Sequence, residues 1–534
     1  MTGTRPQSRR LTRRQFLHRG AYGAAALGVF GVAGCGDWSG RGQAGGSPNE
    51  ADATGPPQSG GILQFAVTDA APDSLLDPAL TEITDDMAIG ATLYEGLVRY
   101  DDEWNVMPVL AEKWESNEDG SEWTFTLREG VTFHDGSPLT AEDVGYSIGR
   151  NLDEELGSAI YARMSGSLDP KGIKPVDDRT ITFQLKRPDS LFTLAVGARQ
   201  GHVVRAGTTD FSDGNGTGPF RLNVYDPGRG WEVERNPNYW DPGKPYLDGI
   251  RSIAILDQAT KVQSVVAGES DFGDRMDAAQ AAVIEASSTA KMLVAKAQTY
   301  LVISMDSTQE PFGDPRIQMA VKLATDREQL LQVAQQGYGS VAKDVPVTSD
   351  APYFPPSLDG RHQDIDRAKK LLADAGYPDG IDLTLYTSDV FGGLVDMAVA
   401  FKQVVAPAGI RVEINRAPAD TYWDQVWLVK PMYTSYYQRR HPNESLSLVY
   451  ISNAQWNEPQ YKSDKLDALV AEGMATTDPE EQDEIYRRAL KLIADEAGTM
   501  IPYFIDTLWP AKNNVQGIIL DPQRSVMFNE AWLA

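Results

Sequence analysis

The chain has 534 residues, of which 41% are apolar, and a formal net charge of −26 that arises from 49 Lys and Arg against 75 Asp and Glu. This composition is typical of a large folded protein of several structural units, and its acidity argues against a nucleic-acid partner, because phosphate neutralisation needs a basic surface. The single cysteine permits neither an internal disulfide nor a cysteine-based metal site.

The N-terminal 34 residues have the features of an export signal. Six arginines and no acidic residue precede or flank a weakly apolar run at residues 21–32. That run is too short to span a bilayer, which takes about twenty residues. Residues 12–17 resemble a twin-arginine signal, and residues 32–35 resemble a bacterial lipobox. We therefore expect residues 1–34 to be a signal peptide that is cleaved before Cys35, whose thiol then receives a lipid.

The segment that follows predicts a tether. Residues 35–59 are rich in Gly, Ser and Pro and contain almost no large apolar residue, a composition typical of a flexible linker. A lipid anchor followed by a tether would hold a folded body at the extracytoplasmic face of the cytoplasmic membrane, in the periplasm or at the cell surface.

Hydrophobic periodicity predicts alternating strands and helices beyond the tether. Alternation of apolar residues indicates strands at 63–67, 123–127, 181–185, 253–255, 381–385 and 412–414. Helix starts are indicated by Asp314-Pro315, by Thr325 with Glu328 as a capping box, by Asp364 and by Asp478-Pro479. Strands mixed with helices, without any 20–50-residue repeat, indicate α/β or α+β lobes.

No motif in the chain makes a convincing catalytic or metal site. Residues 145–149 fit the G-x-S-x-G pattern of hydrolases, but the capping box at residues 140–143 places Ser147 inside a helix rather than on a strand-to-helix turn. The histidines of the mature chain are scattered, and no phosphate-binding glycine loop is present. We expect no catalytic residue, no metal and no cofactor.

A series of sequence blocks runs through the chain from about residue 60 to residue 534. The blocks are residues 76–78 (Leu-Asp-Pro), 94–98 (Tyr-Glu-Gly-Leu-Val), 108–115, 123–136, 138–144, 216–222 (Gly-Thr-Gly-Pro-Phe-Arg-Leu), 235–240 (Arg-Asn-Pro-Asn-Tyr-Trp), 245–248, 326–328 and 368–372. In this order they resemble the peptide/nickel family (oligopeptide/dipeptide type, family 5) of extracytoplasmic solute-binding proteins, which are the receptors of ABC importers.

The resemblance implies an α/β, bilobal periplasmic-binding-protein-like fold, the Venus flytrap, with an extra subdomain inserted in the first lobe. Lobe I would comprise residues 60–300 and 505–534, with the inserted subdomain at about 83–214, and lobe II would comprise residues 301–504. It also implies a monomeric receptor without enzymatic activity. Its partners would be a small-molecule or peptide ligand, the permease, and the ATPase subunits through the permease.

Two other functions stay open at this point. One is a lipid-anchored extracytoplasmic hydrolase or glycosidase, although paired carboxylates carry little weight in so acidic a chain. The other is a sensor that uses the same cleft for signalling.

The resemblance also assigns two walls of a ligand cleft. The first wall would be a segment shortly after the Leu-Asp-Pro block: Glu82, Ile83, Thr84 and Asp85. The alternative for this segment is an exposed acidic loop. The second wall would hold Tyr436, Tyr437, Gln438, Arg439, Arg440 and His441, with Trp456 as a further candidate.

The charge of the second wall favours a particular ligand chemistry. Peptide-binding relatives place an acidic residue there for the peptide's amino terminus, whereas this chain has two arginines and no Asp or Glu before Glu444. An arginine makes strong bonds with a carboxylate or phosphate and repels an ammonium. We therefore expect an anion-bearing or hydroxyl-rich solute, the alternative being that both arginines pair with acidic residues of the protein.

Overall fold

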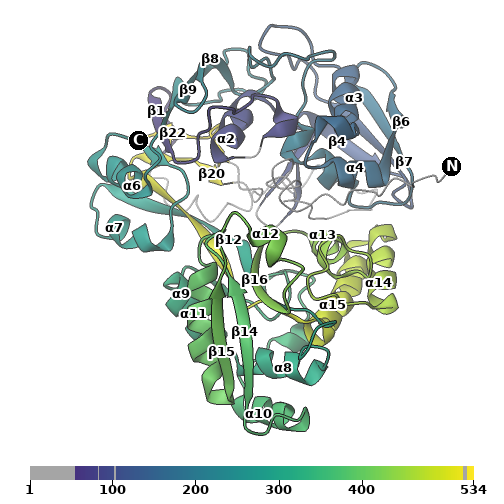
Figure 1. Cartoon of the computed structure of the whole chain (residues 1–534). Coiled ribbons are helices and arrows are strands. Elements are labelled where there is room, and N and C mark those ends of the chain that lie inside the picture. Colours follow the sequence, from purple (N-terminus) through teal and green to yellow (C-terminus); the bar gives the residue numbers. More distant parts are fainter. Residues whose placement is uncertain (1–54, 82, 102–103, 521–525) are drawn as a thin grey trace, which may run out of the picture.

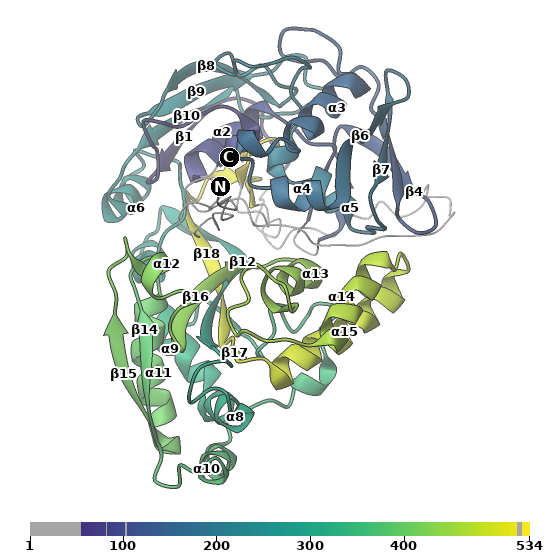
Figure 2. The same ribbon diagram turned by 45° about the vertical axis from the view of Figure 1, so that its right-hand side comes forward.

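The computed structural model describes residues 55–81, 83–101, 104–520 and 526–534, which form two lobes joined by long strands (Figures 1 and 2). The expected signal peptide, Cys35, most of the expected tether, and Glu82 lie outside the described residues. Within the described part of the chain, no helix combines the length and the apolar character needed to cross a membrane.

Lobe I is built on one end of a large mixed sheet. The strand predicted from the alternating Leu63, Phe65 and Val67 is β1 (Ile62–Val67). It pairs in parallel with β10 (Gly249–Ala254) and β11 (Phe272–Gly273). Its other strands and helices are β8 (Phe220–Asp226), β9 (Gly230–Arg235), α2 (Thr84–Leu93), α6 (Gln258–Ala267), α7 (Ala281–Glu285) and the short C-terminal strands β19 (Val515–Gln516), β20 (Ile519–Leu520), β21 (Val526–Met527) and β22 (Trp532–Leu533).

A second core lies beside this sheet, around a four-stranded antiparallel sheet. Its strand order is β4 (Ala111–Ser116), β5 (Glu122–Leu127), β7 (Thr180–Leu185) and β6 (Leu168–Pro175). The hairpin β2 (Val98–Tyr100) and β3 (Val106–Pro108) and the helices α3 (Ala141–Arg150), α4 (Tyr161–Ser167) and α5 (Phe192–Val196) surround it. Thr140 and Asp143 form the capping box that starts α3, so Ser147 lies within a helix, as predicted. We call the residues of this core the inserted subdomain.

Lobe II carries the other end of the large sheet, with one hydrophobic core on each side of it. Its strands are β14 (Ile381–Thr387), β15 (Ile410–Arg416), β16 (Met432–Gln438), β13 (Gly339–Val341) and β17 (Thr499–Met500). Its helices are α8 (Pro315–Ala324), α9 (Arg327–Gln335), α10 (Ile365–Asp374), α11 (Leu394–Val405), α12 (Tyr422–Gln425), α13 (Pro442–Ser445), α14 (Asp464–Ala475) and α15 (Pro479–Glu496).

The caps of these helices confirm three predictions and correct one. Asp314, Asp364 and Asp478 cap α8, α10 and α15 through their side chains. For α9, however, the predicted cap Thr325 is wrong. Its hydroxyl donates to the carbonyl oxygen of Val321 in the preceding helix, and the Asp326 carboxylate accepts from the N–H of Gln329 instead.

Two long antiparallel strands cross between the lobes. They are β12 (Ala290–Met305) and β18 (Tyr503–Lys512), and they make one continuous sheet of the two lobes (Figure 1). Their pairing is interrupted between Ala295 and Thr299, where Ala297 has a φ of 54° and donates its N–H to the Asp506 carboxylate at 2.9 Å. This bulge is a local break in an otherwise regular connection.

The sequence blocks that carry the family resemblance hold lobe I together. Glu95, from the Tyr-Glu-Gly block, is buried and accepts hydrogen bonds from Thr217, Tyr239 and Trp240, which lie in two other blocks. Burial raises the pKa of Glu95 to about 7. Asp77, from the Leu-Asp-Pro block, forms an ion pair with an α3 arginine. These blocks therefore join distant segments of one lobe.

Candidate functional site

The first predicted wall lies at the start of α2 in lobe I. The carboxylate of Asp69 accepts from the backbone N–H groups of Thr84 and Asp85, at 2.7 and 3.2 Å, and so satisfies the free N-terminal end of the helix. The Asp85 carboxylate accepts from the indole of Trp231 at 2.7 Å and from the Ser252 hydroxyl at 3.3 Å. Burial raises the pKa of Asp85 to about 6. Asp85 thus points into lobe I and anchors α2 there.

Thr84, in contrast, lies next to a cationic side chain on the surface of lobe I that faces lobe II. The guanidinium of Arg275 donates to the Thr84 hydroxyl at 2.9 Å and is 3.8 Å from the Asp69 carboxylate. Two residues further on, the Asp277 carboxylate lies 3.8 Å from the position that a Cβ on Gly392 of lobe II would occupy. Ile83, the residue before α2, is half-buried beside this surface.

The second predicted wall is β16 and the turn that follows it in lobe II. Along β16 the side chains alternate between the two faces of the sheet. Tyr437 packs on Tyr300, with ring centroids 5.7 Å apart, and donates its hydroxyl to Glu458 at 2.7 Å. Tyr436, on the other face, is half-buried and stacks on Phe391 at 3.8 Å.

Three other predicted residues of this wall are buried. Gln438 is buried on β16 opposite Thr299 of β12. His441 caps α13, accepting the Asn443 N–H, and its ring packs between two tyrosines, while burial holds its pKa well below the usual value. Trp456 is buried against other aromatic rings. The rings of His441 and Trp456 therefore pack against other aromatic side chains in the interior of lobe II.

The two adjacent arginines are placed differently. Arg440 is buried in lobe II, with its Nε 3.5 Å from a carboxylate oxygen of Glu444. Arg439 extends to the other lobe, where its guanidinium carbon lies 5.6 Å from the ring centroid of Trp104 in the inserted subdomain. The backbone N–H of Arg439 donates to the carbonyl of Gln298, within the bulge of the crossing strand. Arg439 therefore contacts both lobes and the connection between them.

Sequence patterns did not identify Trp104. It is 3% exposed and has a φ of 68°, an uncommon backbone conformation for an aromatic residue. Its partner Arg439 is more than three hundred positions away in the chain, so no local periodicity or spacing could relate the two.

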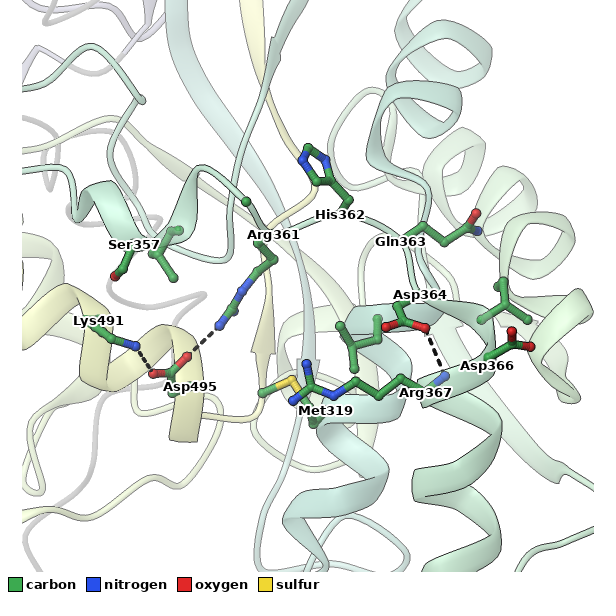
Figure 3. A pocket seen from close by; sticks show the side chains of 14 residues that line it. Met319, Ser357, Arg361, His362, Gln363, Asp364, Asp366, Arg367, Lys491 and Asp495 are labelled. Atoms are coloured by element: carbon green, nitrogen blue, oxygen red, sulfur yellow. Dashed lines mark hydrogen bonds and ion pairs between the residues drawn. The ribbon is translucent and has the colours of Figure 1, made fainter.

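A separate cavity of about 670 Å³ lies in lobe II between α8, α10 and α15 (Figure 3). Charged side chains of both signs line the cavity. The Asp495 carboxylate accepts hydrogen bonds from Arg361 and from Lys491, each at 2.5 Å. None of the predicted ligand residues lines this cavity. It is thus distinct from the surface where the two lobes meet.

The side chains that resemble catalytic motifs have structural partners. The Ser147 hydroxyl donates to the backbone carbonyl of Asp143 and lies 3.1 Å from that of Val204. The ring nitrogens of His134 lie 3.1 Å from the carbonyl oxygens of Gly214 and Gly218. In the described ranges of the chain, no three His, Cys, Asp or Glu side chains are grouped to hold a metal ion.

Comparison with known proteins defines the class that this fold and site belong to. The sequence model of the bacterial extracellular solute-binding proteins, family 5 Middle, matches residues 105–458. The chain therefore belongs to this family, whose members are solute-binding proteins of ABC importers.

Individual relatives agree with this membership. The chain is 26% identical over 475 residues to the glutathione-binding protein GsiB of Shigella boydii serotype 4, a match that covers 85% of this chain and 92% of the relative. Among solved structures, it resembles the Helicobacter pylori periplasmic binding protein DppA in complex with the peptide STSA, at 23% identity and a TM-score of 0.71 over 89% of this chain and 98% of that one.

A further solved structure is AgaA of A. tumefaciens R10 in complex with agropinic acid, at 22% identity and a TM-score of 0.70 over 89% of this chain and 99% of that one. At these identities the solved structures show the fold, which is the bilobal fold that the sequence blocks implied.

Proposed function

We propose that this chain is the lipid-anchored receptor of an ABC importer, and that it captures a small peptide-like solute with an anionic group and delivers it to the permease. The family supports the receptor role. The names of similar proteins, which mention glutathione, a peptide and agropinic acid, support a small peptide-like or acidic solute. The arginine-rich sequence of the second wall supports the anionic group.

The observation that carries the proposal is the position of Arg439 between the lobes. Its guanidinium belongs to lobe II and lies against Trp104 of the inserted subdomain. A carboxylate of the solute would find a charge-assisted, bidentate donor there. We assign the anion-binding role to Arg439 rather than to Arg440, because Arg439 extends toward the other lobe whereas Arg440 is buried within lobe II.

The proposed mechanism requires no bond to be made or broken. A solute that contacts both lobes when they are close, and only one when they are apart, shifts the population toward the closed form. The bulge at Ala297 is the point at which we expect the crossing strands to bend. The closed form would then dock on the permease, with the ATPase subunits beyond it and the lipid on Cys35 keeping the receptor near the membrane.

Calorimetry with glutathione as the probe tests the binding site. Arg439→Ala should weaken binding by about 1.5 kcal/mol or more, the range for a hydrogen bond to a charged group. Arg439→Lys should recover only part of the loss, because an ammonium cannot form the bidentate pair. Arg440→Ala is the matched control, which we expect to lower stability more than affinity.

Unchanged affinity in Arg439→Ala would disprove the role of this residue. Tight binding of simple cationic peptides by the parent protein would disprove an anion-bearing solute.

The membrane anchor is tested separately by fractionation of cells. Cys35→Ala should leave an unprocessed precursor without lipid, and replacing Arg13 and Arg14 by Lys should stop export, because the twin-arginine route reads that pair. A Cys35→Ala protein that is processed and retained at the membrane as before would show that the anchor is elsewhere.

A further inference from the structure

A hydrogen-bonded bridge joins the inserted subdomain to lobe II, away from the crossing strands. The backbone N–H and the hydroxyl of Ser190 both donate to the carbonyl oxygen of Met474, at 3.1 and 3.0 Å. The side-chain amide of Gln482 donates to the Ser190 hydroxyl at 2.9 Å. Ser190 follows β7, whereas Met474 and Gln482 belong to α14 and α15, and these elements are neighbours in both views (Figures 1 and 2). The bonds therefore connect two separate cores.

The subdomain side of the bridge is held rigidly. The neighbouring Asp189 is fully buried, and its carboxylate accepts from the Arg163 guanidinium at 2.6 and 3.1 Å and from the Ser167 hydroxyl at 2.7 Å. Gly120 has a φ of +68°, and a Cβ there would lie 3.2 Å from the Ser190 nitrogen. The donor groups of Ser190 are thus oriented by contacts within their own subdomain.

The lobe II side is fixed in the same way. The Gln482 amide also lies 2.8 Å from the carbonyl oxygen of Gly473 and 2.9 Å from that of Thr476, so it ties the end of α14 to the first turn of α15. Gly473 permits this close approach, since a Cβ there would lie 2.7 Å from the Tyr486 ring. Both partners of the bridge are therefore in place without adjustment of the surrounding structure.

Burial makes the bridge energetically significant. Ser190 is 2% exposed and Gln482 is 3% exposed, so their bonds are shielded from water. In such surroundings a hydrogen bond is stronger, and leaving its groups unpaired is costly.

We propose that Ser190 and Gln482 form a latch that holds the two lobes together and thereby sets the affinity of the receptor for its solute. The inference rests on the proposed function, in which the solute is held by both lobes. Every bond of the latch is made by atoms of the chain itself, so it favours the closed form independently of the solute. The apparent affinity is proportional to the fraction of protein that is closed, so a variant with a smaller closed fraction binds the solute more weakly.

Distances between spin labels on the two lobes test the latch without any solute. Val176, in the inserted subdomain, and Val333, on α9, are 63% and 61% exposed and suit labelling after replacement by cysteine. Replacing the chain's single cysteine, Cys35, by Ser leaves the two labels as the only reactive sites. The parent should give one narrow distance distribution, and Ser190→Ala combined with Gln482→Leu should give a broader distribution with a shifted mean.

Two matched variants control for the loss of buried hydrogen bonds as such. Ser147→Ala removes a buried hydroxyl whose bonds stay within lobe I. Gln318→Leu removes a buried amide that donates at 2.6 Å to Phe312 within lobe II. Both should keep the parent distance. If they broaden it as the latch variant does, or if the latch variant keeps the parent distance, the latch is disproved.

Single Ser190→Ala, which keeps the backbone bond to Met474, provides a second variant in case the double variant does not fold. Far-ultraviolet circular dichroism and a thermal melt verify folding. Ser190→Ala should broaden the distribution much as the double variant does, because it removes the same two hydroxyl bonds across the boundary. A distribution identical to the parent's would again count against the latch.

The effect on affinity is measured by calorimetry with glutathione. The double variant should bind about tenfold more weakly, the equivalent of losing about one well-made hydrogen bond. Unchanged affinity in a variant whose lobes have separated would refute the link between latch and affinity. If the parent itself does not bind glutathione, the proposed solute class is at fault, while the spin-label distances still decide whether the latch exists.

Discussion

Two buried glutamates, one in each lobe, hold aromatic side chains through hydrogen bonds. In lobe I, Glu95 accepts from Thr217 at 2.9 Å, from Tyr239 at 2.7 Å and from Trp240 at 2.9 Å. In lobe II, Glu458 accepts from Trp427 at 2.5 Å and from Tyr437 at 2.7 Å. The chemistry is the same, but the consequences for function differ.

All partners of Glu95 come from sequence blocks that carry the family resemblance, and they lie inside lobe I. Tyr437, a partner of Glu458, lies on β16 one residue before Gln438 and two before Arg439, in the predicted ligand wall. The recognisable blocks thus specify the scaffold of lobe I, whereas the predicted ligand wall is supported by Glu458, which lies outside those blocks. Three experiments test this contrast.

The largest effect is expected when either glutamate is removed. Glu95→Ala and Glu458→Ala each leave buried donors without an acceptor, and each should lower the free energy of unfolding by about 4 kcal/mol. Urea denaturation measures this. The folded fraction of Glu458→Ala should also lose affinity for glutathione, because Tyr437 is no longer held, whereas that of Glu95→Ala should bind as the parent does. Equal losses of affinity would abolish the contrast between the lobes.

The next effect is a pH dependence that belongs to lobe I. Burial raises the pKa of Glu95 from 4.5 to about 7, so the folded protein holds this proton more tightly than the unfolded chain does. The resulting stability is fully present below about pH 4.5 and is lost as the pH rises through 7, for a total of roughly 3 kcal/mol.

Urea denaturation of the parent and of Glu95→Gln between pH 5 and pH 8 tests this. The glutamine variant cannot ionise, and its stability should decline less over this range. Parallel pH profiles for the two proteins would show that Glu95 does not titrate as inferred.

The smallest effect concerns single hydroxyl groups. Tyr239→Phe and Tyr437→Phe each remove one donor to a buried carboxyl group and should each cost about 1.5 kcal/mol of stability. Only Tyr437→Phe should weaken the binding of glutathione in calorimetry, because of the two residues only Tyr437 lies in the predicted ligand wall. A loss of affinity in Tyr239→Phe would mean that the lobe I scaffold influences the solute directly.

Much of the fold followed from local patterns. The predicted strands at residues 63–67 and 381–385 are present as β1 and β14. Buried and less buried residues alternate along β14, because one of its faces packs on a core, whereas Phe65, Ala66 and Val67 of β1 are all buried. Aspartate followed by proline marked the starts of α8 and α15, since this pair satisfies the first N–H groups and tolerates the missing one. The error at Thr325 arose because two adjacent residues both suit a cap, and the preceding helix engages one of them.

The candidate site followed from sequence much less completely. The resemblance pointed to two segments. In the structure, Thr84 is buried beside the Arg275 guanidinium, whereas Arg439 lies against Trp104 of the inserted subdomain. The side chains of Asp85 and Arg440 instead contact partners within their own lobes. A run of residues in sequence does not reveal which side chain turns inward, because that depends on residues such as Trp231 and Glu444 that pack against it.

The sequence was sufficient for the family and, through that resemblance, for the bilobal α/β fold. It also indicated several strands and helix starts and the two arginines of the second wall, because these depend on short-range spacing and on the identity of residues. Only the tertiary structure decided that Trp104 meets Arg439, that Ser190 meets Met474 and Gln482, and that Glu95 and Glu458 anchor the two lobes. Such contacts join residues that can be hundreds of positions apart. Their geometry is set by how the cores pack and how the crossing strands bend, and no local pattern encodes it.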